Sequence, residues 1–200
     1  MEVLRRPHGV LLALPLLACG VTRIEDTRAE VTYTVEQEKT WHVKDRVPSA
    51  ERRVRVYSDG RVTLDGVART WFENGVLESE RYHNDGRPIG TWRSWYESGV
   101  PRSEVVMGDG LEPAPMRFYH PDGTLAAEGM GLAGVKEGEW TFRFPNGAVS
   151  ERGSFRAGIR QGTWTAWDES GAKREQGEYV DGRRAGGWSR WPADTSPPTQ

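Results

Sequence analysis

Few side chains in this 200-residue chain could carry chemistry: four histidines, one cysteine and scattered carboxylates. The histidines His8, His42, His83 and His120 share no spacing typical of metal ligands, so we interpret them as scattered surface residues. The glycines recur at turn-like dipeptides rather than between a strand and a helix, which excludes a phosphate loop. The sequence therefore predicts neither a metal site nor a cofactor.

Glu151 and Glu175 form the nearest approach to a catalytic pair, because they are separated by one repeat of the pattern described below. In a sheet, one such repeat would place them about 9.6 Å apart, near the upper limit for an inverting glycosidase. Nothing else in the sequence converges on this pair. We therefore expect a protein that is not an enzyme.

The only cysteine, Cys19, follows the apolar run "VLLALPLLA" and the basic residues Arg5 and Arg6. A short apolar block behind a charged start is typical of a secretory signal and is too short to span a bilayer. Leu16, Ala18 and Cys19 resemble the lipobox of bacterial lipoproteins, which implies cleavage after residue 18 and lipidation of Cys19. In such lipoproteins Gly20 implies an outer-membrane location. Mature lipidated protein would hold no free thiol and no disulfide.

A period of 24 residues organises the rest of the chain. One glycine series is Gly75, Gly99, Gly123, Gly147 and Gly171; a second is Gly86, Gly110, Gly134, Gly158 and Gly182; a third is Gly66, Gly90, Gly138, Gly162 and Gly186. Tryptophan follows the same step at Trp92, Trp140, Trp164 and Trp188, with Met116 as the exception.

Each repeat is interpreted as a β-hairpin. The first glycine series lies in dipeptides such as Asn74-Gly75 and Asp122-Gly123, which favour two-residue hairpin loops with positive φ at both positions. This register pairs Trp164 with Gly177, and a large ring can cover a bare glycine of the partner strand. The same arithmetic pairs Trp140 with Gly153, and Met116 with Gly129.

Alternation along the strands assigns the tryptophans of the 24-residue series to an apolar inner face and a second set to the outer face. This second set, the outer aromatic row, comprises Trp71, Trp95, Tyr119, Trp167 and Trp191 and is interrupted by Arg143. The predicted register places Arg102 opposite Trp95 and Arg174 opposite Trp167, where cation–π contacts could form. Aromatic and arginine side chains together are typical of binding surfaces, so these residues are the candidate binding surface.

The predicted fold is all-β: one elongated antiparallel meander of stacked hairpins. The boundaries we predict are a signal peptide at 1–18, a tether with one possible strand at 19–53, the repeat domain at 54–191 and a disordered tail at 192–200. The formal net charge of −2 gives no basis for nucleic-acid binding.

The pattern around Gly158, Gly162, Trp164, Trp167 and Gly171 resembles the MORN-repeat variant of bacterial proteins often labelled YwqK-family antitoxins. The resemblance spans about residues 66–191 and implies a meander of hairpins. It departs at "GLEPAP", where Met116 also replaces tryptophan.

The leading functional hypothesis is a non-catalytic lipoprotein, anchored to the bacterial cell envelope through Cys19, whose repeats bind a protein partner. A carbohydrate-binding module using Trp71, Trp95 and Trp167 is the alternative from a different class. An antitoxin or immunity role rests on the family label alone.

Overall fold

The computed structural model describes residues 22–24, 32–42, 47–108 and 110–192, which form one sheet of 14 antiparallel strands in chain order. The strands are β1 (Thr22–Ile24), β2 (Tyr33–Trp41), β3 (Pro48–Tyr57), β4 (Val62–Trp71), β5 (Leu77–Asn84), β6 (Arg87–Trp95), β7 (Pro101–Met107), β8 (Ala114–Tyr119), β9 (Leu125–Leu132), β10 (Val135–Arg143), β11 (Val149–Arg156), β12 (Ile159–Trp167), β13 (Lys173–Val180) and β14 (Arg183–Arg190). The predicted all-β meander is confirmed. Within the described part of the chain, no helix is long and apolar enough to cross a membrane.

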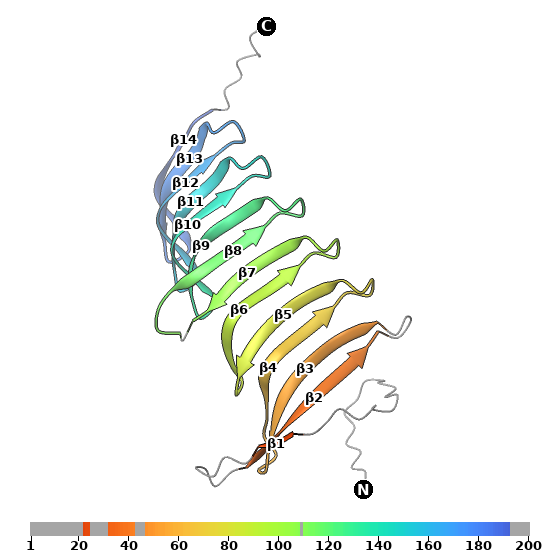
Figure 1. Cartoon of the computed structure of the whole chain (residues 1–200). Helices are drawn as coiled ribbons and strands as arrows, with labels where there is room; N and C mark the ends of the chain where they lie inside the picture. The colour runs from red at the N-terminus through yellow and green to blue at the C-terminus, as the bar shows by residue number, and fades with distance from the viewer. Residues whose placement is uncertain (1–21, 25–31, 43–46, 109, 193–200) are drawn as a thin grey trace, which may run out of the picture.

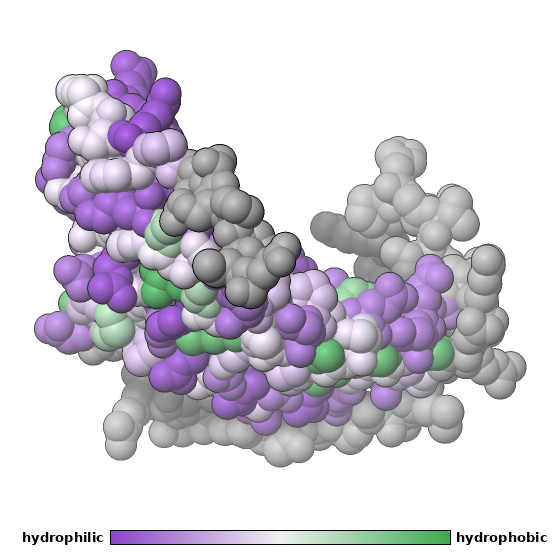
Figure 2. All heavy atoms as spheres, turned by 90° about the horizontal axis from the view of Figure 1, so that it is seen from above, coloured by the Kyte–Doolittle hydropathy of each residue, from purple (hydrophilic) through white to green (hydrophobic). Residues whose placement is uncertain are grey.

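The hairpins stack one above the next into a long ladder (Figure 1). Seen from above, the two ends of the molecule extend in clearly different directions (Figure 2). The right-handed twist of each strand pair accumulates over a sheet of this length, which explains the turn. Apolar side chains in that view form separate spots among hydrophilic ones (Figure 2).

The three predicted strand pairings are confirmed. Trp164 pairs with Gly177, Trp140 with Gly153, and Met116 with Gly129. The 24-residue period therefore determined the register in these hairpins, because each repeat carries the same turn at the same place.

The prediction that Trp164 covers Gly177 was wrong. An added Cβ on Gly153 would lie 2.2 Å from the Trp164 ring. An added Cβ on Gly177 would lie 2.3 Å from the ring of Trp188 instead. The Trp140 ring likewise covers Gly129, where an added Cβ would lie 2.5 Å from the ring. Each of these rings leans toward the preceding hairpin, so the contact joins consecutive repeats instead of closing one hairpin.

The sequence analysis placed the two-residue hairpin loops at the wrong end of the hairpins. At Asp168–Ala172 the amide of Gly171 donates to the carbonyl of Asp168, and the amide of Asp168 donates to Ala172, which encloses three loop residues. Only the glycine of each such loop has positive φ, 84° to 87° in Gly75, Gly99, Gly123, Gly147 and Gly171. This is a three-residue loop that ends in a left-handed glycine.

Two-residue loops occur at the opposite end, between consecutive hairpins. Asp85-Gly86, Ala133-Gly134, Ala157-Gly158 and Asp181-Gly182 have positive φ at both positions. Their flanking residues pair directly, as Arg156 does with Ile159. These loops match the type I′ geometry that was predicted for the other end.

The three-residue loops also change the predicted arginine partners. Trp95 pairs with Pro101 and Trp167 pairs with Lys173, because each returning strand carries a register shift beside the loop. Arg102 and Arg174 are the residues that these shifts skip. The predicted pairings of Arg102 with Trp95 and of Arg174 with Trp167 were therefore wrong.

Consecutive hairpins are also joined at their two-residue loops. The amide of Gly158 donates to the carbonyl of Lys136 over 2.9 Å, and the preceding amide, of Ala157, donates to the Glu137 carboxylate over 2.8 Å. One repeat later, Asp181 donates in the same way to Gln161, over 3.0 Å. In these two loops the amides are thus satisfied by the hairpin before them.

The sheet begins before residue 54, where we placed the start of the repeat domain. β2 and β3 pair with each other from Tyr33–Tyr57 to Trp41–Pro48, so most of both strands lies within residues 19–53, which we expected to be a tether. The predicted signal peptide, Cys19 and residues 193–200 of the expected tail lie outside the described residues.

The Trp164–Gly153 contact predicts that Gly153→Ala lowers the free energy of unfolding by about 1–3 kcal/mol, because the added methyl group must displace the buried ring. Gly187→Ala is the matched control, since nothing lies within 4 Å of its Cβ position, and it should change stability by less than about 0.5 kcal/mol. Urea unfolding monitored by circular dichroism measures both. Equal midpoints for the two variants would contradict the packing role.

Candidate functional site

The inner face of the sheet carries an aromatic core centred on Trp140 and Trp164, which are 1% and 2% exposed. Phe155 lies between them and meets both rings edge to face, with centroid separations of 6.0 Å and 5.1 Å. Met116 and Ala127 complete the buried cluster. These side chains are buried although the described residues form a single sheet.

Long cationic side chains provide the cover that a second layer would supply. The guanidinium of Arg160 lies 4.0 Å from the centroid of Trp164, and that of Arg184 lies 3.9 Å from Trp188. The Lys136 ammonium lies 4.5 Å from Trp140. The charged groups themselves lie over the rings as cation–π contacts, so these side chains cover the apolar surface of the core.

Glu151 and Glu175 both line a shallow depression on this face, between Trp164 and Trp188. Each carboxylate is already paired: Glu151 with Arg160 over 2.6 Å, and Glu175 with Arg184. The Arg184 hydrogen bond lowers the pKa of Glu175 below its ordinary value. Glu175 is therefore ionised at neutral pH and is not the protonated acid that a glycosidase needs.

The outer face carries ion pairs beside the outer aromatic row. Arg69 pairs with Glu80 over 2.8 Å and Arg93 with Glu104 over 3.0 Å, each two residues before a tryptophan of the row. Trp71, Trp95, Tyr119 and Trp167 are half-buried, and Trp191 is 38% exposed. The row thus consists of partly exposed rings beside paired charges rather than a continuous apolar strip.

The cations near the outer aromatic row differ from those predicted. Arg102 lies 5.8 Å from the centroid of Tyr96, and Lys173 lies 5.1 Å from Trp191. Nη1 of Arg174 is buried with no hydrogen-bond partner among the described residues.

Trp41 was missed by the sequence analysis although it continues the row at the N-terminal end. It is 52% exposed, and Lys39 lies 4.9 Å from its centroid. The signal was present: a hydroxyl residue, tryptophan and a ring residue follow one another in Thr40-Trp41-His42, as they do in Thr70-Trp71-Phe72 and Ser94-Trp95-Tyr96.

Two histidines connect neighbouring hairpins. Nε2 of His42 hydrogen-bonds to the carbonyl of Trp71 over 2.8 Å, and Nε2 of His120 to that of Arg143 over 2.9 Å. The hydroxyl of Tyr96 makes the equivalent bond to Tyr119 over 2.7 Å. These side chains have structural partners, and the described residues contain no group of three or more candidate metal ligands.

His83 was wrongly interpreted as a surface residue. It is 7% exposed, its ring centroid lies 5.2 Å from that of Trp92, and its Nδ1 has no partner in the described part of the chain. Burial, with a smaller contribution from Arg81, lowers the pKa of His83.

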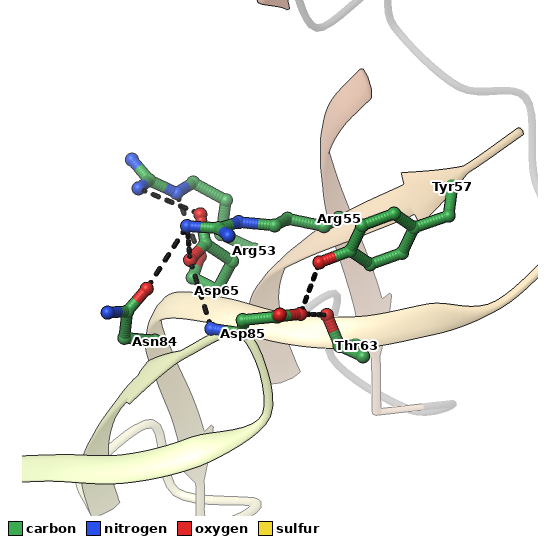
Figure 3. A network of polar contacts seen from close by, with 7 residues as sticks. All are labelled: Arg53, Arg55, Tyr57, Thr63, Asp65, Asn84 and Asp85. Carbon is green, nitrogen blue, oxygen red and sulfur yellow. Dashed lines mark hydrogen bonds and ion pairs between the residues drawn. The ribbon is translucent and has the colours of Figure 1, made fainter. Parts of the chain in front are cut away.

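A polar network lies at the N-terminal end of the repeats (Figure 3). The Asp65 carboxylate, 8% exposed, pairs with Arg55 over 2.8 Å and with Arg53 over 3.5 Å. It also accepts the amide of Asp85 over 3.4 Å, the bond that Glu137 makes in a later repeat. Except for Nε of Arg55, which is buried with no partner among the described residues, these groups pair with one another and with the next loop, so we interpret the network as structural.

Two hairpins of the sheet match a known repeat. The sequence profile of the MORN repeat variant matches residues 64–85 and 88–107, which correspond to the hairpins β4–β5 and β6–β7. The MORN-repeat part of the predicted resemblance is thereby supported. A comparison with curated proteins gives no match.

Buried His83 predicts that stability falls as the pH is lowered through its unfolded pKa of about 6.5. Its folded pKa is lower, so below this pH the unfolded chain binds a proton that the folded chain does not, which favours unfolding. Between about pH 7 and pH 5.5 the urea midpoint of the parent protein should decrease more than that of His83→Leu. Parallel pH profiles for the two proteins would exclude this role.

Proposed function

We propose that this protein is a non-catalytic lipoprotein of the bacterial cell envelope whose hairpin repeats bind another protein. The observation that carries the proposal is the outer aromatic row, whose rings lie along an open sheet beside paired charges. Tryptophan, tyrosine and arginine are the side chains that most often anchor protein interfaces. The MORN-repeat match supports a repeat-based binding surface.

The outer face suits a protein partner because its charges are balanced along the row. Arg69 pairs with Glu80 and Arg93 with Glu104 beside aromatic positions, and Arg143, which interrupts the row, pairs with Glu128. A partner would meet rings and charges of both signs, which gives specificity through charge complementarity.

Membrane attachment rests on Leu16, Ala18 and Cys19, which match the lipoprotein signal. A lipid-anchored chain would hold the sheet near a membrane surface, where a partner in the same membrane is encountered at high effective concentration.

The anchor predicts that Cys19→Ser abolishes incorporation of radioactive palmitate and moves the protein from the membrane fraction to the soluble fraction. Cys19 is the only acceptor that the lipobox offers. Expression in a bacterial host followed by fractionation and autoradiography measures both effects. Labelling that persists in the Cys19→Ser variant would refute the anchor.

The binding surface predicts that Trp191→Ala, and more strongly Trp95→Ala with Trp167→Ala, lower capture of a specific membrane protein at least about tenfold. Val180→Ala, a change at a 52% exposed residue outside the row, is the control. The assay is a pull-down by the lipidated protein from its own membranes, quantified by mass spectrometry, with circular dichroism to confirm that each variant is folded.

Undiminished capture by the folded Trp95→Ala, Trp167→Ala protein would remove the outer aromatic row from the proposal. Binding of the parent protein to a glycan array, lost in the same variant, would favour a carbohydrate ligand instead. Capture of a toxin whose activity the protein suppresses would favour an immunity role.

A further inference from the structure

Three cations recur at the 24-residue period on the inner face: Lys136, Arg160 and Arg184. Each lies over the tryptophan four residues later in its own repeat. Arginine occupies two of these positions and lysine the third. This exchange matters because only lysine has an amine that can become neutral and nucleophilic in a protein.

The carboxylate that pairs with each arginine is missing at Lys136. Glu151 lies nine residues before Arg160 and Glu175 nine before Arg184, whereas Ala127 occupies that position relative to Lys136. Ala127 is 5% exposed in the core. No carboxylate among the described residues forms an ion pair with Lys136.

Aromatic rings surround the Lys136 ammonium instead. Nζ lies 4.5 Å from the centroid of Trp140, 4.7 Å from Phe142 and 5.1 Å from Phe155. Phe118 completes the set at 5.7 Å. The side chain as a whole remains partly exposed.

The charges around Lys136 do not compensate for this burial. On β12, Arg160 adds a second cation, and on β11, Glu151 is engaged by Arg160. On the other side, β8 and β9 present Met116, Phe118 and Ala127 to the same core. Burial, with a smaller contribution from Arg160, lowers the pKa of Lys136.

We propose that Lys136 is a site of covalent N-acylation, at which an activated acyl donor such as an acid anhydride, acyl phosphate or thioester neutralises the lysine. The neutral amine attacks the acyl carbon and forms an amide bond. The carboxylate, phosphate or thiolate leaves with the bonding electron pair, and the amine proton passes to solvent.

The product fits the same surroundings. An amide has no net charge, so acylation removes a poorly solvated ammonium without breaking an ion pair. By contrast, Lys39 lies 3.9 Å from Glu51, and Lys173 is exposed and donates to Gln176 over 3.2 Å. Acylation would therefore change the charge of the inner face specifically at Lys136.

Competitive labelling of the folded parent protein tests the proposal, because the chain has only four lysines: Lys39, Lys44, Lys136 and Lys173. With limiting acetic anhydride near pH 7, Lys136 should be acetylated at least about threefold faster than Lys39 and Lys173, as measured by peptide mass spectrometry. The preference should shrink near pH 10, where ordinary lysines also become neutral, and should disappear in urea.

A matched variant supplies the missing carboxylate. Ala127→Glu reproduces the arrangement of Glu151 with Arg160, so the Lys136 ammonium should be stabilised and its acetylation near pH 7 should slow to the rate of Lys39 or below. Lys136→Arg should lose this label alone.

The proposal is overturned if, in the folded parent protein near pH 7, Lys136 is acetylated no faster than Lys39 and Lys173. It is also overturned if the preference for Lys136 is the same in urea, because the reactivity would then come from local sequence rather than from the aromatic surroundings. The parent protein gives both results even if Ala127→Glu does not fold.

Discussion

The packing of a tryptophan ring onto a backbone glycine of the preceding strand is the contact on which the aromatic C-terminal repeats depend. It recurs at an interval of eleven residues in Trp140 over Gly129, Trp164 over Gly153 and Trp188 over Gly177. Any side chain at the glycine would occupy the space of the ring. Because the two partners belong to consecutive hairpins, the same contact that buries the ring also determines how the next hairpin is stacked.

A single sheet cannot bury aromatic rings between two layers, so this protein uses its own long cations as the second layer. Lys136, Arg160 and Arg184 lie over the rings of Trp140, Trp164 and Trp188. On the inner face, cationic side chains therefore cover the rings. On the outer face, half-buried rings lie beside ion pairs. This difference is why the outer face is proposed as the binding surface.

The fold and much of the register could be predicted from the sequence because the glycine and tryptophan series share one period. The period cannot show which way a ring leans. Trp164 pairs with Gly177 through its backbone, yet its ring crosses to Gly153. Dipeptide preference also misled the turn assignment, since Asp168 accepts three local donors and stabilises a three-residue loop. The burial of His83 left no trace in local sequence, because it arises from the ring of Trp92 in the next strand.

The third repeat divides the array into two blocks with different inner faces. At the interval that relates glycine and tryptophan in the later repeats, it has Val105 and Met116, and the repeat before it has Arg81 and Trp92. The pairing of β7 with β8 is limited to three residue pairs there. On the N-terminal side the inner face is joined by hydroxyl pairs, Thr70 with Ser79 and Ser94 with Ser103. Opening of the sheet at β7–β8 would therefore separate a polar block from an aromatic one, and the Lys136 surroundings belong entirely to the aromatic block.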